Sequence, residues 1–576
     1  MENAPFGAFF FGDVMSMVAV VLFILSWLVP LHFPPWMSWH SEAMAFFAVL
    51  LLGWCGLARV LRSAGPRTVT LPLAALPFIG LALVAALQRA SGLMTFWGDV
   101  WAIWFYMALC VACLTLGFAA ASPSAQPRAT ADASAPVTLL AFTLLVGALA
   151  STVIAFSQVF SLWEHPGWIV RMSTLRAGGN LAQPNHLATL LVMGVASLVL
   201  LYESGKLGGI ASSLILIVLG LGLAAAESRT GMLGVLVLVL WWLAKRRHFG
   251  SKTPAWVAGV AGGGFALSFW AWPTLLNSML LNYQAGVSTS SIFLRFEVWQ
   301  QLLEAVTLRP WWGWGIHEVA KAHNAVAHSY AVSAPFAYSH NLVLDLVLWV
   351  GLPLAGVLVI VIGGWLWRRV RAANQLLPWY GLAVALPVAV HSMLEYPFAY
   401  AYLLAPVMFA LGAVEASLGV KPLLRMGIKP VAALLLATTA VLAWSMVEYL
   451  EIEEDFRVAR FEALRVGSPP PEHLRPKVIL YTQLDVLLDA ARITPTLNMS
   501  PEAMQVVKKS ALYYPWSATQ YRYAVALALN GDPVEAARQI QVMRRLWGEE
   551  LYEGVKKQIN ELAASKYPEL RRLSLP

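Results

Sequence analysis

His340, Arg229 and Arg295 are the side chains of this sequence whose types and positions best fit chemistry at a membrane surface. A neutral imidazole can accept a proton from a hydroxyl group near pH 7. Guanidinium groups bind phosphate through paired hydrogen bonds, and a pyrophosphate leaving group needs its developing charge neutralised. One base and two guanidiniums that meet in one water-accessible hollow would therefore suffice to displace a pyrophosphate without a metal ion.

Each of these residues also has a simpler interpretation. His340, with Asn341 beside it, starts an apolar segment and could cap the helix that follows. Arg229 lies between two apolar segments, where a charge is costly, and Glu227 could hold it as an ion pair. Arg295 could be a solvated arginine of an amphipathic helix.

A second polar segment leads into an apolar run after the turn at Gly178-Gly179. Its candidate binding side chains are Arg176, Gln183, Asn185 and His186. Backbone N–H groups at the start of a helix favour anions, so this segment predicts a polar pocket at a helix N-terminus. Alternatively, Asn185 only caps the helix that Pro184 starts.

The other histidines of the long polar segment 273–339 do not predict a metal site. His317, His323 and His328 are six and five residues apart, which does not match ligands on one helix, and no HExxH segment occurs. Cys110 and Cys113 have the spacing of a metal or redox pair, but they lie in an apolar segment without histidine or acidic neighbours. We therefore expect ordinary packing of these cysteines, no disulfide, no metal and no cofactor.

The composition excludes a soluble protein. Of 576 residues, 59% are hydrophobic and only 12% are charged, with a mean hydropathy of +0.66, whereas soluble domains carry roughly 25% charged residues. Apolar runs long enough to cross about 30 Å of hydrocarbon recur along the chain. We expect an all-α polytopic membrane protein with about thirteen spans, near residues 11–30, 43–61, 71–88, 98–119, 137–159, 185–202, 210–226, 229–245, 254–272, 340–366, 378–393, 398–417 and 430–448.

Lysine and arginine set the expected orientation of these spans. If the N-terminus is cytoplasmic, lysine and arginine are denser in the cytoplasmic loops than in the outside loops. With this orientation, the long polar segment 273–339 and the C-terminal tail face outside. The net charge of +8 then mostly reflects the basic residues of the cytoplasmic loops. The sequence contains no basic soluble domain that would indicate nucleic-acid binding. The expected domains are N-terminal transmembrane helices at 1–272, a large external loop at 273–339, C-terminal transmembrane helices at 340–449 and an external helical tail at 450–576.

The loop and the tail each predict helices. Apolar residues from Phe293 to Val306 recur at spacings of three and four, as in an amphipathic helix at the interface. The acidic run 451–455 is expected to be a solvated extension of the last span. In the tail, the turn Gly531-Asp532-Pro533, flanked by alanines and tyrosine, is typical of a tetratricopeptide-like (TPR-like) helix pair. Such pairs could hold an acceptor protein or brace the enzyme.

Three segments together resemble a known family. His340-Asn341 followed after nine residues by Gly351 resembles the signature of the O-antigen ligase, O-antigen polymerase and protein O-oligosaccharyltransferase superfamily. The segments 179–189 and 391–397 are more similar to the bacterial protein O-oligosaccharyltransferases (PglL type) than to the lipopolysaccharide ligases.

The resemblance implies a glycosyl transfer on the periplasmic face of the bacterial inner membrane. An oligosaccharide would leave undecaprenyl pyrophosphate and join a Ser or Thr hydroxyl of a pilin-like periplasmic protein, without a metal or nucleotide cofactor. It implies His340 as the base and Arg229 with Arg295 as the pyrophosphate clamp. The remaining candidates would line the sugar or acceptor side of the site: Arg176, Gln183, Asn185, His186, Asn341, Glu395 and Tyr396. A single displacement would invert the anomeric carbon.

Two other functions stay open at this point. A lipopolysaccharide ligase or polysaccharide polymerase would use the same chemistry with another acceptor, although the helical tail and the Gln-Pro-Asn-His segment argue against it. A transporter of the same lipid-linked sugar belongs to a different class. Transporters commonly show internal repeats and charges at the midplane, whereas the polar groups here collect on one side.

Overall fold

The structure is a computed structural model, and it describes residues 6–63, 65–122, 135–163, 165, 167–172, 176–279, 290–464 and 473–575, without the side chains of 6–13, 290–292 and 463–464. These residues form two compact units, which are described separately. Unit 1 comprises residues 1–81, 105–287 and 362–443, and unit 2 comprises residues 82–104, 288–361 and 444–576.

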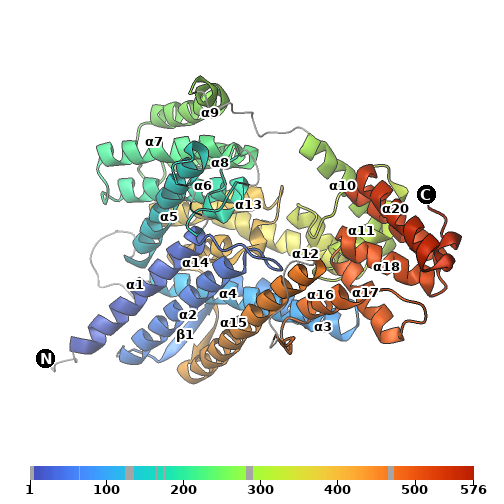
Figure 1. Cartoon of the computed structure of the whole chain (residues 1–576). Coiled ribbons are helices and arrows are strands. Elements are labelled where there is room, and N and C mark those ends of the chain that lie inside the picture. Colours follow the sequence, from blue (N-terminus) through green and yellow to red (C-terminus); the bar gives the residue numbers. More distant parts are fainter. Residues whose placement is uncertain are drawn as a thin grey trace. The chain divides into compact units, whose positions relative to one another are not determined.

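The described chain is mostly helical (Figure 1). Unit 1 contains α1 (Phe6–Leu28), α2 (Trp39–Arg62), β1 (Thr68–Pro72), η1 (Leu73–Ala75), α5 (Ala135–Phe160), η3 (Gly179–Leu181), α6 (Pro184–Glu203), α7 (Gly209–Ala226), α8 (Arg229–Lys245), α9 (Ala255–Ser278), α13 (Leu376–His391), η5 (Pro397–Ala399), α14 (Ala401–Ser417) and β2 (Pro422–Gly427). Unit 2 contains α10 (Ser290–Leu308), α11 (Val319–Val326), η4 (Ala327–Ser329), α16 (Thr482–Arg492), α17 (Pro501–Tyr513), α18 (Ser517–Leu529), α19 (Pro533–Trp547), α20 (Glu549–Ser565) and η6 (Pro568–Arg572). Four helices pass from one unit into the other: α3 (Leu76–Ala90), α4 (Trp97–Ala121), α12 (Leu342–Ala372) and α15 (Ile428–Leu464).

Every segment predicted as a membrane span overlaps a helix. Nine helical segments within the described residues are long and apolar enough to cross a membrane, and three further apolar helices are shorter. The prediction of a helical polytopic membrane protein is therefore confirmed. The count of thirteen spans stays a prediction.

Two of the predicted domain boundaries fall inside helices. Helix α9 continues through Pro273 to Ser278 instead of ending at residue 272, because a proline inside a helix removes only one backbone hydrogen bond and neighbouring elements can accommodate it. Helix α15 continues from the last span to Leu464. Residue 450 thus lies inside a helix, and the acidic run extends that helix as predicted. The run is not solvated throughout, because Asp455 is buried and pairs with His473 and Arg492. Residues 280–289 of the predicted loop lie outside the described part.

A two-stranded sheet, which the sequence did not predict, accompanies the helices of the all-α architecture. Strands β1 and β2 pair antiparallel, with Thr68 opposite Gly427 and Leu71 opposite Leu424. The segment Thr68–Pro72 contains the β-favouring pair Thr-Val and lies before its helix begins, so it adopts an extended conformation. Both strands belong to loops that the sequence predicts on the cytoplasmic side.

Hydrogen bonds between loops of unit 1 sort these loops into two sets. Within the set predicted outside, His32 Nε2 lies 2.7 Å from the carbonyl oxygen of Asn180. Within the set predicted inside, Glu203 accepts a hydrogen bond from the Ser251 hydroxyl (2.5 Å). These pairings agree with the predicted alternation of loops. Which set faces the cytoplasm stays a prediction.

Helix α6 is the most enclosed span of unit 1. In its most apolar stretch of 18 residues, 78% of the residues are buried. The helix packs against α5, α7, α8 and α13. Close packing depends on small residues, as usual between membrane helices. At Gly194, for example, an added methyl would lie 2.7 Å from Ala148 Cβ. The first turn of α6 therefore holds its polar side chains in a rigid frame.

Candidate functional site

The Glu395 carboxylate is the centre of a buried hydrogen-bond network in unit 1. It follows the C-terminus of α13 and is only 4% exposed. Gln183 Nε2 donates to its Oε2 (2.9 Å) and Asn185 Nδ2 donates to its Oε1 (2.6 Å). His391, one turn earlier, lies with Nε2 3.0 Å from Oε2. We call this set, with Thr189, the Glu395 network.

The partners fix the orientation of the His391 ring. A carboxylate can only accept, so Nε2 of His391 carries the proton toward Glu395. In the neutral ring, Nδ1 then accepts from the Thr189 hydroxyl at 2.9 Å. Neither His391 nor Thr189 was among the residues predicted to line the site. The signal was present, because residues four apart share a helix face and ionisable residues at the ends of spans mark functional sites.

Asn185 joins the Glu395 network to the start of α8. Its Oδ1 accepts from Arg176 Nη2 (3.1 Å) and from the Ser228 hydroxyl (2.6 Å). Ser228 in turn is the N-cap of α8, because its hydroxyl oxygen accepts from the backbone N–H of Gly231 (2.9 Å). Asn185 is therefore more than a helix cap, since its amide bridges two segments of the site.

Arg229 is the first residue of α8, directly after Ser228. Its side chain is half-buried, and among the described residues it forms no ion pair, with Glu227 or any other acid. The structural ion pair considered as the simpler interpretation is thus not formed in the described chain. The guanidinium lies at a helix N-terminus, where backbone N–H groups also favour anions.

Aromatic rings border the Glu395 network. His186 packs edge-on against Tyr400, with ring centroids 4.3 Å apart, and its Nδ1 lies 3.1 Å from the Tyr402 hydroxyl. Tyr396 stacks on Tyr400 at 6.0 Å. Arg176, Gln183, Asn185, His186, Glu395 and Tyr396 therefore lie close together in unit 1, and their role in a binding site stays a prediction.

His186, His391 and Glu395 are the group in the described chain that could hold a metal ion. Their ligand atoms lie within 4.8 Å of one another. Both oxygens of Glu395 accept amide N–H groups, and both nitrogens of His391 face hydrogen-bond partners. Hydrogen bonds thus already satisfy these ligand atoms, and the prediction that no metal is used is kept as a prediction.

His340 lies in unit 2, in a rigid turn before α12. Its backbone φ is 62°, a left-handed conformation that costs a non-glycine residue roughly 1–2 kcal/mol. Ser339 N donates to the buried Asp345 carboxylate (2.7 Å), and Asn341 Oδ1 accepts from Val343 N (3.0 Å). Asn341 is therefore the helix cap, whereas His340 is held in a strained conformation of the kind that clusters at functional sites.

Helix α10 fixes this turn from the other side. Trp299 Nε1 donates to the Ser339 carbonyl (2.6 Å). Arg295 is half-buried and lies one turn before Trp299 on the same face of α10. Unit 2 thus places Arg295 about 6 Å along the helix axis from the residue that contacts the His340 turn. Arg229 belongs to the other unit, so its pairing with Arg295 and His340 rests on the sequence alone.

The structure explains why the last residue of the signature, Gly351, is a glycine. Its φ is 79°, it interrupts the helical conformation of α12, and an added Cβ would lie 2.3 Å from the Trp311 carbonyl oxygen. Leu352 N donates to the Pro310 carbonyl (2.8 Å). The glycine thus lets the loop after α10 lie directly on α12, which fixes the loop relative to the His340 turn.

The other loop histidines do not gather. His323 is buried, with Nε2 2.8 Å from Gln301 Oε1 and 3.0 Å from the Ser333 hydroxyl, and burial lowers its pKa to about 4. His328 belongs to η4, which packs against α19. These two histidines have different surroundings, and the absence of a zinc site from the loop stays a prediction.

Tail helices pack on the loop within unit 2. Asn324 Nδ2 of α11 donates to Gln539 Oε1 of α19 (3.1 Å), and Arg538 donates to the Asn324 carbonyl (3.0 Å). Consecutive helices from α16 to α20 contact one another, and the predicted turn at Gly531 does separate α18 from α19. The tail therefore braces the loop. Whether it is TPR-like stays a prediction.

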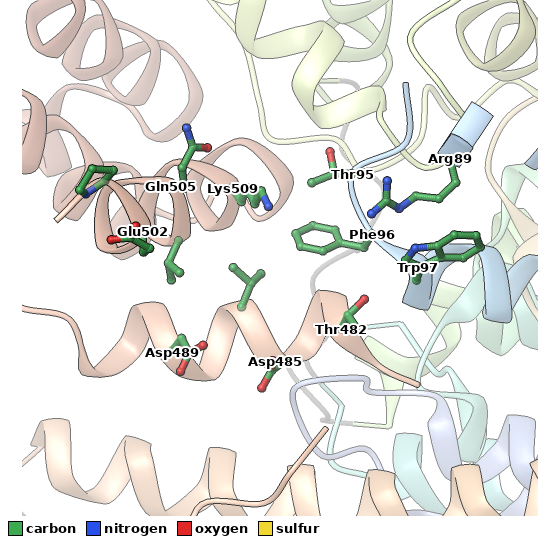
Figure 2. A pocket seen from close by; sticks show the side chains of 13 residues that line it. Arg89, Thr95, Phe96, Trp97, Thr482, Asp485, Asp489, Glu502, Gln505 and Lys509 are labelled. Carbon is green, nitrogen blue, oxygen red and sulfur yellow. The ribbon is translucent and has the colours of Figure 1, made fainter. Parts of the chain in front are cut away.

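Two cavities lie along α17. The first has a volume of about 560 Å³ and lies between α16, α17 and the connection from α3 to α4 (Figure 2). Its lining includes the aromatic rings of Phe96 and Trp97, with the Arg89 guanidinium 5.2 Å from the Trp97 ring centroid. The second, about 420 Å³, lies between α11 and α17–α19, and Gln505 lines both.

Comparisons with known proteins agree with the sequence signature. The family described as O-antigen ligase matches residues 214–359, the family described as virulence factor membrane-bound polymerase, C-terminal, matches residues 379–560, and the family described as protein glycosylation ligase matches residues 177–202. These matches confirm the predicted resemblance to the O-antigen ligase/polymerase superfamily, and the chain is a membrane glycosyltransferase.

Two curated relatives narrow the class. The chain is 25% identical over 547 residues to a general O-oligosaccharyltransferase of Acinetobacter baylyi, covering 92% of both chains. It is 28% identical over 250 residues to the ComP-specific O-oligosaccharyltransferase of the same organism, covering 42% of this chain and 44% of the relative. Within the superfamily, the chain is thus related to the bacterial protein O-oligosaccharyltransferases, as the segments 179–189 and 391–397 indicated.

Proposed function

We propose that this enzyme transfers an oligosaccharide en bloc from undecaprenyl pyrophosphate to a Ser or Thr hydroxyl of a pilin-like periplasmic protein. The observation that carries the proposal is the strained His340 turn, which unit 2 fixes from α10, α12 and the following loop in a chain related over nearly its whole length to O-oligosaccharyltransferases. His340 accepts the proton of the acceptor hydroxyl. The hydroxyl oxygen then attacks the anomeric carbon, and the pyrophosphate leaves with inversion.

The pyrophosphate is proposed to bind to Arg229 and Arg295. Both guanidiniums are half-buried, Arg229 begins α8 and Arg295 belongs to the helix that fixes the His340 turn. Two guanidiniums would neutralise the charge that develops on the leaving group, which is the role a metal ion plays elsewhere. The Glu395 network with Tyr396 is proposed to line the sugar side. The site is proposed to face the periplasm, with the N-terminus in the cytoplasm of an inner-membrane protein.

Glycopeptide mass spectrometry tests the reaction. Periplasmic proteins of cells with the wild-type gene should carry glycopeptides that vanish on deletion, and His340→Ala, Arg229→Ala and Arg295→Ala should not restore them. Arg368→Ala, an exposed arginine on the predicted cytoplasmic side, is the matched control and should restore them fully. Loss of lipopolysaccharide capping alone would instead assign an O-antigen ligase. Normal glycopeptides in either clamp variant would remove that arginine from the clamp.

The acceptor protein is proposed to contact the tail at the two cavities beside α17. Both contain apolar and charged side chains within the unit that carries His340. Gln505 is exposed and lines both, so Gln505→Trp would fill them without disturbing the core. We expect a higher KM for the acceptor protein and an unchanged KM for the lipid donor. Gln558→Trp, on exposed α20, is the matched control, and equal effects of the two variants would refute the cavities as the acceptor site.

A further inference from the structure

A chain of three hydrogen-bonded side chains lies beside the His340 turn in unit 2. His317 Nδ1 lies 3.4 Å from Asp99 Oδ1, and His317 Nε2 lies 3.4 Å from the Tyr338 hydroxyl. The His317 and Tyr338 rings meet edge-on, with centroids 5.9 Å apart. The Asp99 side chain is 3% exposed, whereas that of His317 is 27% exposed. A buried carboxylate thus supports a histidine that solvent can reach.

The backbone holds His317 in an unfavourable conformation. Its φ is 66°, again the left-handed region that costs a non-glycine residue roughly 1–2 kcal/mol. The neighbouring residues are firmly anchored, because Gln88 Oε1 accepts from Ile316 N (3.0 Å) and Thr95 N donates to Glu318 Oε1 (2.5 Å). Strain that the surroundings enforce is typical of functional sites and is not needed for packing alone.

The carboxylate determines which nitrogen of His317 carries its proton. Asp99 can only accept, so Nδ1–H points at Asp99 and, in the neutral ring, Nε2 accepts from the Tyr338 hydroxyl. Tyr513 of α17 also donates to Asp99 Oδ1. The tail therefore also fixes the carboxylate. A continuous hydrogen-bonded path thus runs from Tyr513 in the tail through Asp99 and His317 to Tyr338.

Tyr338 connects this path to the predicted base. It precedes His340 by two residues, and Ser339 between them is held through its N–H by Asp345 and through its carbonyl by Trp299. A shift of the Tyr338 ring would thus be transmitted to a short, rigid turn. Misplacement of a catalytic group by about 1 Å can lower a rate by about 100-fold.

We propose that Asp99 and His317 are positioning residues of the transfer reaction: they fix Tyr338 and, through it, the turn that carries His340. The proposal rests on the function proposed above, and it adds two residues that neither the signature nor the loop spacing selects. Since the pair acts on geometry, its loss should reduce kcat and leave the binding of the lipid donor unchanged.

The test uses the purified full-length enzyme with undecaprenyl-pyrophosphate-linked oligosaccharide and an acceptor protein identified by glycopeptide mass spectrometry. His317→Gln and Asp99→Asn should each lower kcat about tenfold or more, with the donor KM changed less than about twofold. The double variant should be no slower than the slower single variant, because the two residues act as a unit. His323→Gln is the matched control, since it removes another hydrogen-bonded imidazole of the same loop, and its kcat should stay within about twofold per folded enzyme.

Four outcomes separate the alternatives. Wild-type kcat in folded His317→Gln would overturn the proposal, and so would equal losses in the His317 and His323 variants. If His317→Gln does not fold, His317→Asn and Asp99→Asn decide by the same criterion. Wild-type enzyme that glycosylates no protein but caps a lipid acceptor would refute the proposed function, and the kcat comparison would then be made with that lipid acceptor.

Discussion

Replacement of Glu395 by glutamine should separate the structural from the functional part of the Glu395 network. The carboxylate accepts from Gln183, Asn185 and His391. A glutamine oxygen has two lone pairs and its nitrogen only donates, so at least one of the three donors, which are buried or half-buried, loses its acceptor. An unsatisfied buried donor costs about 1–3 kcal/mol, and the charge-assisted hydrogen bonds are also weakened. We therefore expect Glu395→Gln to lower the free energy of unfolding by about 1–3 kcal/mol.

Unit 1 offers a matched control at Glu203. This carboxylate is also buried, and it accepts from the Ser251 hydroxyl (2.5 Å), Lys252 N (2.8 Å) and the Thr253 hydroxyl (2.7 Å). It belongs to the loops predicted on the opposite side of the membrane from Glu395. Glu203→Gln should thus cost a similar amount of stability without touching the site.

The two variants are compared by transfer rate per folded enzyme. Thermal unfolding in detergent gives the folded fraction, and gel shift of the acceptor protein gives the rate. We expect Glu395→Gln to lose at least tenfold in rate after this correction and Glu203→Gln to lose less than about twofold. Equal corrected rates in the two variants would refute the assignment of the Glu395 network to the site and leave it a structural feature.

Three further predictions follow from particular contacts. Gly351→Ala should destabilise the protein by about 2–4 kcal/mol in thermal or denaturant unfolding, because a Cβ on this left-handed backbone would lie 2.3 Å from the Trp311 carbonyl oxygen. The control Gly356→Ala in the same helix has open space around it and should be neutral or stabilising. Burial keeps the pKa of His323 at about 4, below its unfolded value near 6.5. The contribution of the neutral imidazole to the free energy of unfolding, up to about 3 kcal/mol, is therefore complete above pH 6.5 and is lost as the pH falls from 6.5 toward 4. The free energies of unfolding of wild type and His323→Gln, measured across this range, should converge at low pH. Excess EDTA should leave the transfer rate unchanged, since hydrogen bonds occupy the possible ligand atoms around Glu395, and a loss reversed by an added divalent cation would show instead that a metal is required.

The sequence could predict the helices, and that the candidate residues lie near helix ends, because both follow from local rules. Apolar runs reveal spans, and the polar residue that begins or ends a run is visible without a structure. The hydrogen-bond partners could not be predicted in this way. His391 bonds to Glu395 within one motif, but Asn185 meets Ser228 from 43 residues away. Such pairs depend on which helices pack together, and an apolar surface does not specify its neighbour.

Backbone strain was also outside the reach of the sequence. Histidine adopts a left-handed φ more often than most residues other than glycine, but its residue type alone does not predict one at His317 or His340. The surroundings impose it, through anchors such as Gln88 that lie far away in sequence. The β1–β2 sheet was missed for a related reason, because its strands are short and each needs a partner more than 300 residues away in the chain.

The position of the site residues at helix ends explains why their spacing is so wide. The interior of a span has no water to solvate a charge, so a guanidinium or carboxylate there is costly, whereas a helix end has unpaired backbone groups and access to the interface. Each candidate accordingly lies at or next to a terminus of an apolar helix or of the helix that supports it: Asn185 in α6, Arg229 in α8, Glu395 after α13 and His340 before α12. Since a span needs about 20 residues, chemistry in such a protein must be assembled from single residues that many spans deliver to one side. A contiguous catalytic motif is therefore not expected in this class of enzyme, and the signature is a set of helix ends.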